Sequence, residues 1–200
     1  MKSPKSLFVL AAIILFGMGM TTSCKNKPVA DMQGEETTAA AKADKCPCLV
    51  AIENFLVDSI GKSYSPGEVC IPAYSIIAID TNLPTVKIWG DWWVFNYNIT
   101  GDTLKCVSGG SHPGLFQLEK NGDYFNLVAF DQVEDGSNWL PSAQRIFGEH
   151  YDAFHAVNSN QELRDSTRLA MTAQYVKEYG LPVTMLQDHG WPAVALPTCK

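Results

Sequence analysis

Apolar side chains recur at three- and four-residue intervals between Pro47 and Gly61, where the chain carries Leu49, Ile52, Phe55, Leu56 and Ile60. This spacing places them on one side of an α-helix, and glycine is a typical residue to end one. The pattern therefore predicts a helix over 47–61 whose apolar stripe packs against a sheet.

From Cys70 to Trp139 the pattern changes to short segments rich in β-branched and aromatic residues, which are typical of strands. Gly101-Asp102 fits a two-residue hairpin turn of type II′, in which glycine occupies the first position. In that register Tyr97 lies opposite Cys106 and Ile99 lies opposite Leu104. Cys106 is then expected on the apolar face and buried.

A second hairpin is predicted by Asn121-Gly122, the strongest short-range signal for such a turn. It joins residues 115–120 to residues 123–133. The register that pairs Lys120 with Asp123 gives one apolar face, which consists of Phe116, Leu118, Phe125 and Leu127. We expect this face to lie against the helix.

Two helices are predicted beyond the strands. One covers 141–147, and a longer one begins at the capping-box sequence Ser159 to Glu162 and ends near Gly180. Residues 181–200 are rich in proline and are expected to be irregular. The order of elements predicts an α+β domain in which an N-terminal helix packs on a curved antiparallel sheet, with helices at the C-terminal end.

The first residues carry a different pattern, because an apolar run of 14 residues from Leu7 to Met20 follows Lys2 and Lys5 and precedes Cys24. This is the layout of a secretory signal peptide, and the run is shorter than the roughly 20 residues that a membrane-spanning helix needs. We expect residues 1–23 to be a signal peptide that is cut off before Cys24. Plain secretion, with Cys24 incidental, is the alternative.

The residues before Cys24 resemble the lipobox of bacterial lipoproteins, with Thr21 where that box usually has leucine. The resemblance implies lipid on the sulfur and an acyl chain on the nitrogen, and more than one acyl chain anchors a protein stably. It therefore implies a protein anchored in the bacterial cell envelope, at the outer membrane or facing the periplasm. Residues 24–45 hold almost no large apolar side chain and are expected to be a flexible tether, followed by a single domain over 46–200.

Composition narrows the partners. The net charge is −6 and no stretch concentrates lysine and arginine, which argues against nucleic acid as a partner. The chain holds six cysteines, of which five remain once Cys24 is lipidated, in a compartment that permits disulfides. Cys70 and Cys106 are the candidates for a disulfide. Cys46-Pro47-Cys48 has neither the spacing of thioredoxin-like proteins nor a complete zinc set, so redox catalysis is a minor alternative.

The region from Trp92 to Gly148 carries a series of short motifs, which are Ser108-Gly109-Gly110-Ser111-His112-Pro113-Gly114, Leu118-Glu119-Lys120, Asp123-Tyr124, Glu134-Asp135-Gly136-Ser137 and Ile146-Phe147-Gly148. It resembles a poorly characterised exported domain of bacterial lipoproteins, which also follows the membrane metallopeptidase part of β-lactam-sensor-like proteins. The resemblance implies a roll like those of the NTF2 and cystatin folds. It implies no known activity.

His112 lies directly opposite Asp131 if the register of the second hairpin continues. A carboxylate that orients an imidazole is the beginning of an acid–base pair, and Glu134 and Asp135 would lie close by. The structural alternative is that Asp131 hydrogen-bonds His112 and caps the sheet where Pro113 interrupts it. Because no nucleophile, second base or oxyanion donor is identifiable, His112 and Asp131 are the only catalytic candidates.

Trp92 and Trp93 are candidates for ligand binding, together with Glu134 and Asp135, since aromatic rings offer a large flat contact area. A place in the core is the alternative for both tryptophans. His150 and His155 are five residues apart, so they do not share a helical face as a zinc-binding pair would. No metal or other cofactor is expected.

Three functions remain open. The leading one is a non-enzymatic lipoprotein that binds a small ligand or an envelope protein in the concave face of the roll, in an apolar cavity with few polar groups. A hydrolase or isomerase that uses His112 and Asp131 requires both side chains in that cavity and within hydrogen-bond reach. A sensor or inhibitor module for an envelope peptidase rests on the resemblance alone.

Overall fold

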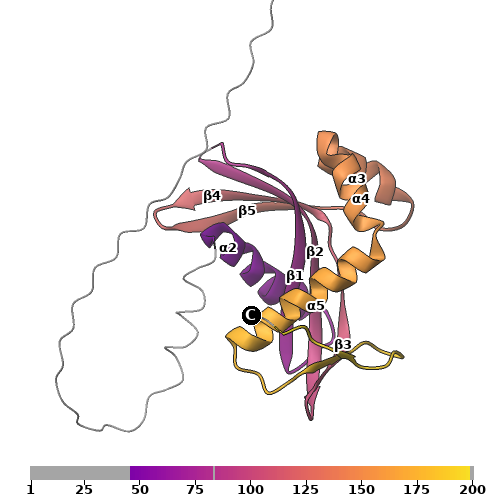
Figure 1. Ribbon diagram of the computed structural model, residues 1–200. Helices are drawn as coiled ribbons and strands as arrows, with labels where there is room; N and C mark the ends of the chain where they lie inside the picture. Colours follow the sequence, from indigo (N-terminus) through magenta and orange to yellow (C-terminus); the bar gives the residue numbers. More distant parts are fainter. Residues whose placement is uncertain (1–45, 83, 199–200) are drawn as a thin grey trace, which may run out of the picture. The chain divides into compact units, whose positions relative to one another are not determined.

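The long strand β2, Thr85–Thr100, is the centre of the sheet (Figure 1). In the computed structural model, which describes residues 46–82 and 84–198, β2 pairs along one side with β1, Val69–Asp80. Its other side pairs with two strands in succession, β3, Thr103–Ser111, and β4, Gly114–Asn121. Both are antiparallel to β2, so β3 and β4 form two halves of one line that breaks at His112 and Pro113.

Three further strands widen the sheet. β5, Tyr124–Gln132, pairs with β4, and β6, Met185–Gln187, runs parallel to β3. β7, Val194–Ala195, pairs with β6. The described residues therefore form a large curved sheet of seven strands.

One face of this sheet is covered by α2, Pro47–Phe55, which continues through a π-helical turn, Leu56–Ile60, and a 3-10 turn, Gly61–Ser63. Together these turns occupy the region in which the sequence predicts one helix over 47–61. The apolar stripe does face the sheet, since Ile52 and Leu56 are fully buried in a cluster with residues of β2 and β4, which are Val86, Ile88, Trp92, Phe116 and Leu118.

The other face is covered by the helices that follow the strands. A 3-10 turn, Gly136–Asn138, leads into α3, Trp139–Phe147, and a second one, Gly148–His150, leads into α4, Tyr151–Asn158. These helices bury Phe147 and Phe154, whose rings stack with their centres 3.9 Å apart. The longest helix, α5, Gln161–Glu178, packs along β1. The fold is mixed α+β, as the sequence predicts.

The first hairpin has the predicted register. Tyr97 pairs with Cys106 and Ile99 pairs with Leu104, and Gly101 turns the chain with a φ of +61°. Cys106 packs in the same cluster as Tyr97 and Leu104, but its side chain is only partly buried.

The register predicted for the second hairpin is wrong. Asn121 still belongs to β4 and pairs with Tyr124, so the turn consists of Gly122 and Asp123, one position later than predicted. An irregularity at Gln117/Leu118 then shifts the pairing once more and brings Phe130 opposite Phe116, with the two rings stacked at 4.1 Å. The shift adds a third aromatic ring to the apolar face that Phe125 and Leu127 also contact.

Two elements near the C-terminal end differ from the prediction. The cap of α5 is Asn160 rather than Ser159, since the Asn160 side chain accepts a hydrogen bond from the Leu163 N–H and the Ser159 hydroxyl donates to the His155 carbonyl. The region expected to be irregular contributes β6 and β7 to the sheet. Three-residue and two-residue strands carry too few positions to show an alternating pattern.

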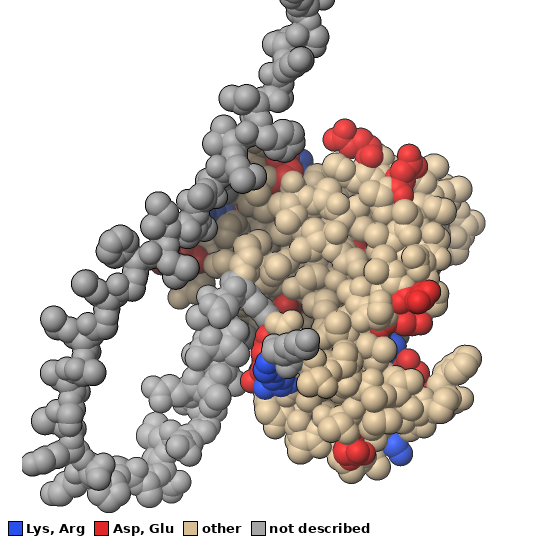
Figure 2. Space-filling model, viewed as in Figure 1, with Lys and Arg blue, Asp and Glu red and all other residues tan. Residues whose placement is uncertain are grey.

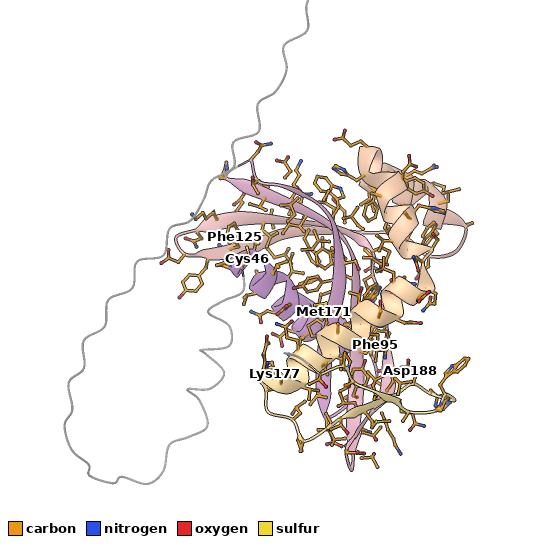
Figure 3. The ribbon with its side chains drawn as sticks, in the orientation of Figure 1. Cys46, Phe95, Phe125, Met171, Lys177 and Asp188 are labelled. Atoms are coloured by element: carbon orange, nitrogen blue, oxygen red, sulfur yellow. The ribbon has the colours of Figure 1, made fainter. Side chains whose placement is uncertain are left out.

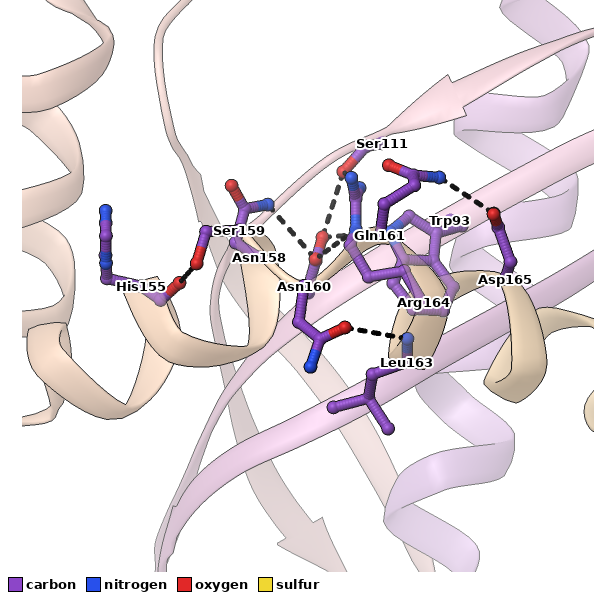
Figure 4. Close-up of polar contacts among 11 residues, drawn as sticks. Trp93, Ser111, His155, Asn158, Ser159, Asn160, Gln161, Leu163, Arg164 and Asp165 are labelled. Atoms are coloured by element: carbon purple, nitrogen blue, oxygen red, sulfur yellow. Dashed lines mark hydrogen bonds and ion pairs between the residues drawn. The ribbon is translucent and has the colours of Figure 1, made fainter.

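A buried carboxylate joins the sheet to the helices on this second face, and Figure 4 labels its partners Trp93, Ser111, Asn158 and Arg164. Asp91 on β2 is completely buried and accepts hydrogen bonds from Trp93 Nε1 and Ser111 Oγ, both at 2.9 Å. Asn158 of α4 donates to its second oxygen at 3.1 Å, and Arg164 of α5 forms an ion pair with that oxygen at 3.1 Å. Two strands and two helices therefore meet at one charge.

We expect Asp91→Ala to lower the free energy of unfolding by about 3–5 kcal/mol, because removing one partner of a buried ion pair leaves the other charge uncompensated. Urea denaturation of the variant and the parent protein measures the difference. Asp131→Ala is the control, since Asp131 is an exposed carboxylate of the same sheet and its loss is expected to cost no more than about 0.5 kcal/mol. Equal effects of the two substitutions would contradict the structural role assigned to Asp91.

Candidate functional site

A cleft of about 430 Å³ lies between α2 and α5, along the edge of β1 that does not pair with β2. Figure 3 labels Cys46 at the start of α2 and Met171 on α5, which line it from two sides. The π-helical turn after α2 supplies Val57 and Asp58, and β1 supplies the floor. The side chains that give the cleft its chemical character are Cys46, Glu53, Asp58, Cys70, Tyr74, Met171, Tyr175 and Tyr179.

Tyrosines form much of the polar surface of the cleft. The Tyr74 hydroxyl donates to Glu53 Oε1 at 3.0 Å, and burial together with the Glu53 carboxylate raises the pKa of Tyr74. Tyr175 and Tyr179 stack at 4.2 Å, and burial raises the pKa of Tyr175 to about 12. The Tyr74 hydroxyl is therefore already used as a donor to Glu53, whereas Tyr175 keeps its proton at neutral pH and can donate it to a ligand.

The described residues that line the cleft carry negative charge. Glu53 and Asp58 contribute carboxylates, and no lysine, arginine or histidine is among the described residues that line it. Lys62 forms an exposed ion pair with Asp58 at 2.9 Å, from outside the lining. Because exposed ion pairs are weak and screened by salt, the ion pair with Lys62 offsets the charge of Asp58 only in part.

Two cysteines, Cys46 and Cys70, also line the cleft, and both carry free thiols. Burial raises the pKa of Cys70 to about 11. Partial burial also raises the pKa of Cys46, but hydrogen bonds with Cys48 and with the backbone outweigh it and leave that pKa below its ordinary value. Burial and the neighbouring Cys46 raise the pKa of Cys48 to about 12.

The predicted disulfide between Cys70 and Cys106 is wrong, because both are free thiols. Cys70 lies on the α2 face of the sheet, where its sulfur approaches Gly61. Cys106 packs with Tyr97 and Leu104 on the opposite face. Since successive side chains of a strand point to opposite faces, the sheet separates the two sulfurs.

His112 and Asp131 do not meet. Asp131 pairs with Leu115 in the sheet and accepts a hydrogen bond from the Gln117 side chain at 3.2 Å. His112 instead shares a hydrogen bond of 3.0 Å between its Nε2 and the Tyr64 hydroxyl. The predicted pair depended on the register of the second hairpin, which the turn and the irregularity shift by two and then three residues.

His112 is bonded within the fold and is mostly buried. Burial lowers the pKa of His112, and Gln132 and the Asp135 carboxylate offset this only in part. Its backbone N–H donates to the Trp92 carbonyl at 2.7 Å and so extends the pairing of β3 with β2 by one residue. His112 does not line the α2–α5 cleft.

The candidate ligand-binding residues Trp92, Trp93, Glu134 and Asp135 also lie away from the cleft. Trp92 is fully buried and donates to the Gly114 carbonyl, and Trp93 is 3% exposed and donates to Asp91. Both indoles belong to the core, which corrects their prediction as a ligand platform. Glu134 and Asp135 are exposed before α3, where Glu134 accepts a hydrogen bond from Asn138.

Sequence reasoning did not single out Glu53, Tyr74 or Tyr175. One signal was present, since Met171, Tyr175 and Tyr179 recur at four-residue intervals and so share one face of α5. Tyr74 gave no such signal, because its strand and the two helices come together only in three dimensions.

No cluster of three or more histidine, cysteine, aspartate or glutamate side chains suited to a metal occurs within residues 46–82 and 84–198. His150 lies against the Trp89 ring and His155 against the Tyr151 ring. None of the helices that the structure describes has the length and apolar character needed to cross a membrane. Comparison of the chain with protein-family models, with curated proteins and with solved structures found no match.

We expect iodoacetamide to alkylate Cys46 at least roughly tenfold faster than Cys48 or Cys70 near neutral pH, since the thiolate is the reactive form and, of these three thiols, Cys46 alone has a lowered pKa. Mass spectrometry of peptides from a time course measures each site separately. Cys46→Ser removes the fast site and serves as the control. If Cys70 reacts as fast as Cys46, the arrangement of thiols described for the cleft is incorrect.

Proposed function

We propose that this protein is an exported lipoprotein, anchored in the bacterial envelope by lipid on Cys24, and that its folded part is a binding module without catalytic activity. The sequence pattern of residues 1–23 and the lipobox-like residues before Cys24 support the anchor, and these residues lie outside the described part of the chain. The α2–α5 cleft is the observation that carries the binding role. Its volume falls within the range of roughly 300–1,000 Å³ that is usual for small-molecule sites.

The ligand proposed for the cleft is a small organic cation with an apolar body. Tyr175 and Tyr179 offer aromatic rings, whose faces attract positive charge. Glu53 and Asp58 add negative charge, while no basic side chain is among the described residues of the lining. Leu49, Pro72 and Met171 supply apolar contacts for the rest of such a ligand.

The arrangement also supports the finer description of the fold as an NTF2- or cystatin-like roll, since α2 lies across one face of a curved and largely antiparallel sheet. The enzymatic alternative has lost the geometry on which it depended, because His112 and Asp131 are apart and neither lines the cleft. A partner in the envelope is compatible with the anchor. The cleft favours a small ligand.

Lipidation of Cys24 is testable in a bacterium fed an alkyne-tagged fatty acid. We expect the tag to appear on the mature N-terminal cysteine by mass spectrometry, and the protein to fractionate with membranes. Cys24→Ser is expected to abolish both, because more than one acyl chain is needed for stable anchoring. An unmodified thiol at residue 24, or a mature N-terminus at another residue, would refute the anchor.

Binding in the cleft is testable with thioflavin T, a cationic aromatic dye whose emission rises when it is immobilised. We expect saturable binding to the full-length protein, displaced by phenyltrimethylammonium. Tyr179→Ala is expected to raise the dissociation constant roughly tenfold, through the loss of an aromatic contact worth about 1–2 kcal/mol.

Two matched controls separate the cleft from the general surface. Tyr124 is 77% exposed at the tip of the second hairpin, so Tyr124→Ala is expected to leave binding unchanged. Asp58→Lys is expected to weaken binding through charge reversal in the cleft, while the same change at the exposed Asp123 has little effect. Binding that is equally sensitive at Tyr124 and Tyr179 would rule the cleft out.

A further inference from the structure

A second hollow, of about 590 Å³, lies between the first half of α5 and the hairpin formed by β6 and β7. None of its lining residues belongs to the α2–α5 cleft. Trp191, in the turn of this hairpin, lines the hollow with its side chain 71% exposed. Every other tryptophan of the chain is at least half-buried, so Trp191 stands out as an aromatic ring presented to solvent.

The backbone beneath Trp191 is held by hydrogen bonds. Its N–H donates to the Asp188 carbonyl at 3.1 Å, and its carbonyl accepts from the Gln187 side chain at 3.0 Å. Leu186 of the hairpin and Leu169 of α5 give the hollow an apolar base. The Trp191 ring is therefore carried by an ordered turn and lies next to apolar side chains, which is the arrangement that an aromatic stacking contact requires.

Polar groups line the opposite side of the hollow, on α5. Gln161 and Asp165 are exposed one turn apart, and Gln161 Nε2 donates to Asp165 Oδ1 at 2.8 Å. Within the described part of the chain, no hydrogen bond or ion pair involves Asp165 Oδ2 or Gln161 Oε1. Both oxygens are hydrogen-bond acceptors that a ligand can use.

Arg168 supplies the third polar group, and its charge is already compensated. Its two terminal nitrogens donate to the two oxygens of Asp188, at 3.0 and 2.7 Å. Nε and Nη2 also donate to the Tyr97 hydroxyl, and the guanidinium lies 3.8 Å from the centre of the Phe95 ring. Since a guanidinium has five N–H groups, one on Nη1 is left over as a donor.

The balance of these groups selects a class of ligand. Asp165 and Asp188 against Arg168 give the lining a net negative charge, which disfavours phosphates and other anions. A simple ammonium ion can only donate hydrogen bonds and would leave the Arg168 N–H unused. The hollow fits a neutral ligand that both donates and accepts hydrogen bonds and has a flat C–H face for the indole.

We propose that this hollow is a carbohydrate-binding site, in which one sugar ring stacks on Trp191 and its hydroxyls donate to Asp165 and accept from Arg168. Sugars carry hydroxyls that both donate and accept, and their axial C–H groups present a weakly positive face to the negative face of an aromatic ring. The site is separate from the α2–α5 cleft and does not depend on the ligand proposed there. It would give an envelope-anchored protein a contact with a neutral glycan.

The test is isothermal titration calorimetry of the full-length protein with triacetylchitotriose, cellotriose and maltotriose, in a detergent without a sugar headgroup. We expect saturable binding of at least one trisaccharide with a dissociation constant in the millimolar range or below. Trp191→Ala and Asp165→Ala are each expected to weaken that binding roughly tenfold or more, which corresponds to about 1.4 kcal/mol. Both side chains are exposed, so neither change endangers folding.

Tyr124→Ala is the matched control, since it removes an aromatic ring that is 77% exposed elsewhere on the protein. It is expected to leave sugar binding unchanged, as is Tyr179→Ala in the α2–α5 cleft. The proposal is overturned if no trisaccharide binds, or if Trp191→Ala binds as tightly as the parent protein. It is also overturned if only inorganic phosphate or phenyltrimethylammonium binds in a way that depends on Trp191.

Discussion

The buried charge of Asp91 is the constraint on which the arrangement of the helices depends. A carboxylate with no exposed surface is stable only when its oxygens are supplied with donors, and Asp91 receives them from β2, β3, α4 and α5. No single element could satisfy it. Arg164 also lies over the Trp93 ring and donates to Ser111, so this group ties α5 to both β2 and β3.

A second constraint comes from the length of β2. With 16 residues, β2 is longer than either neighbouring strand on the side opposite β1, so two strands share that side. Pro113 has no N–H to donate, so the line formed by β3 and β4 breaks there. The His112 N–H still bonds to β2, while the Pro113 carbonyl accepts from Val133. The break turns β4 and β5 toward α2 and leaves the other half of β2 to β3, β6 and α5.

Local patterns in the sequence were sufficient for some of the fold and insufficient for the site. The stripe of Ile52 and Leu56 and the register of the first hairpin follow from spacing and from one glycine turn, and both agree with the structure. The register predicted for the second hairpin was wrong, because the strong Asn-Gly turn signal competed with the packing of Phe130 on Phe116. The turn shifts the register by two residues, which keeps the same face inward, but the irregularity at Gln117/Leu118 makes the shift three at Asp131 and pairs that residue with Leu115, away from His112. Positions that depend on the meeting of distant segments, as Glu53 and Tyr74 do, had no local signature.

The same helix contributes to both proposed sites, and this follows from how it is fixed. Gln161, Asp165 and Arg168 face the hairpin of β6 and β7, whereas Met171, Tyr175 and Tyr179 face α2. Arg164, next to Asp165 in the first part of α5, forms the ion pair with Asp91. Since a helix moves largely as a rigid body, a shift at one end that strains the Asp91 group would be felt at the other end. The buried charge therefore holds the helix that both hollows share, although neither hollow contains it.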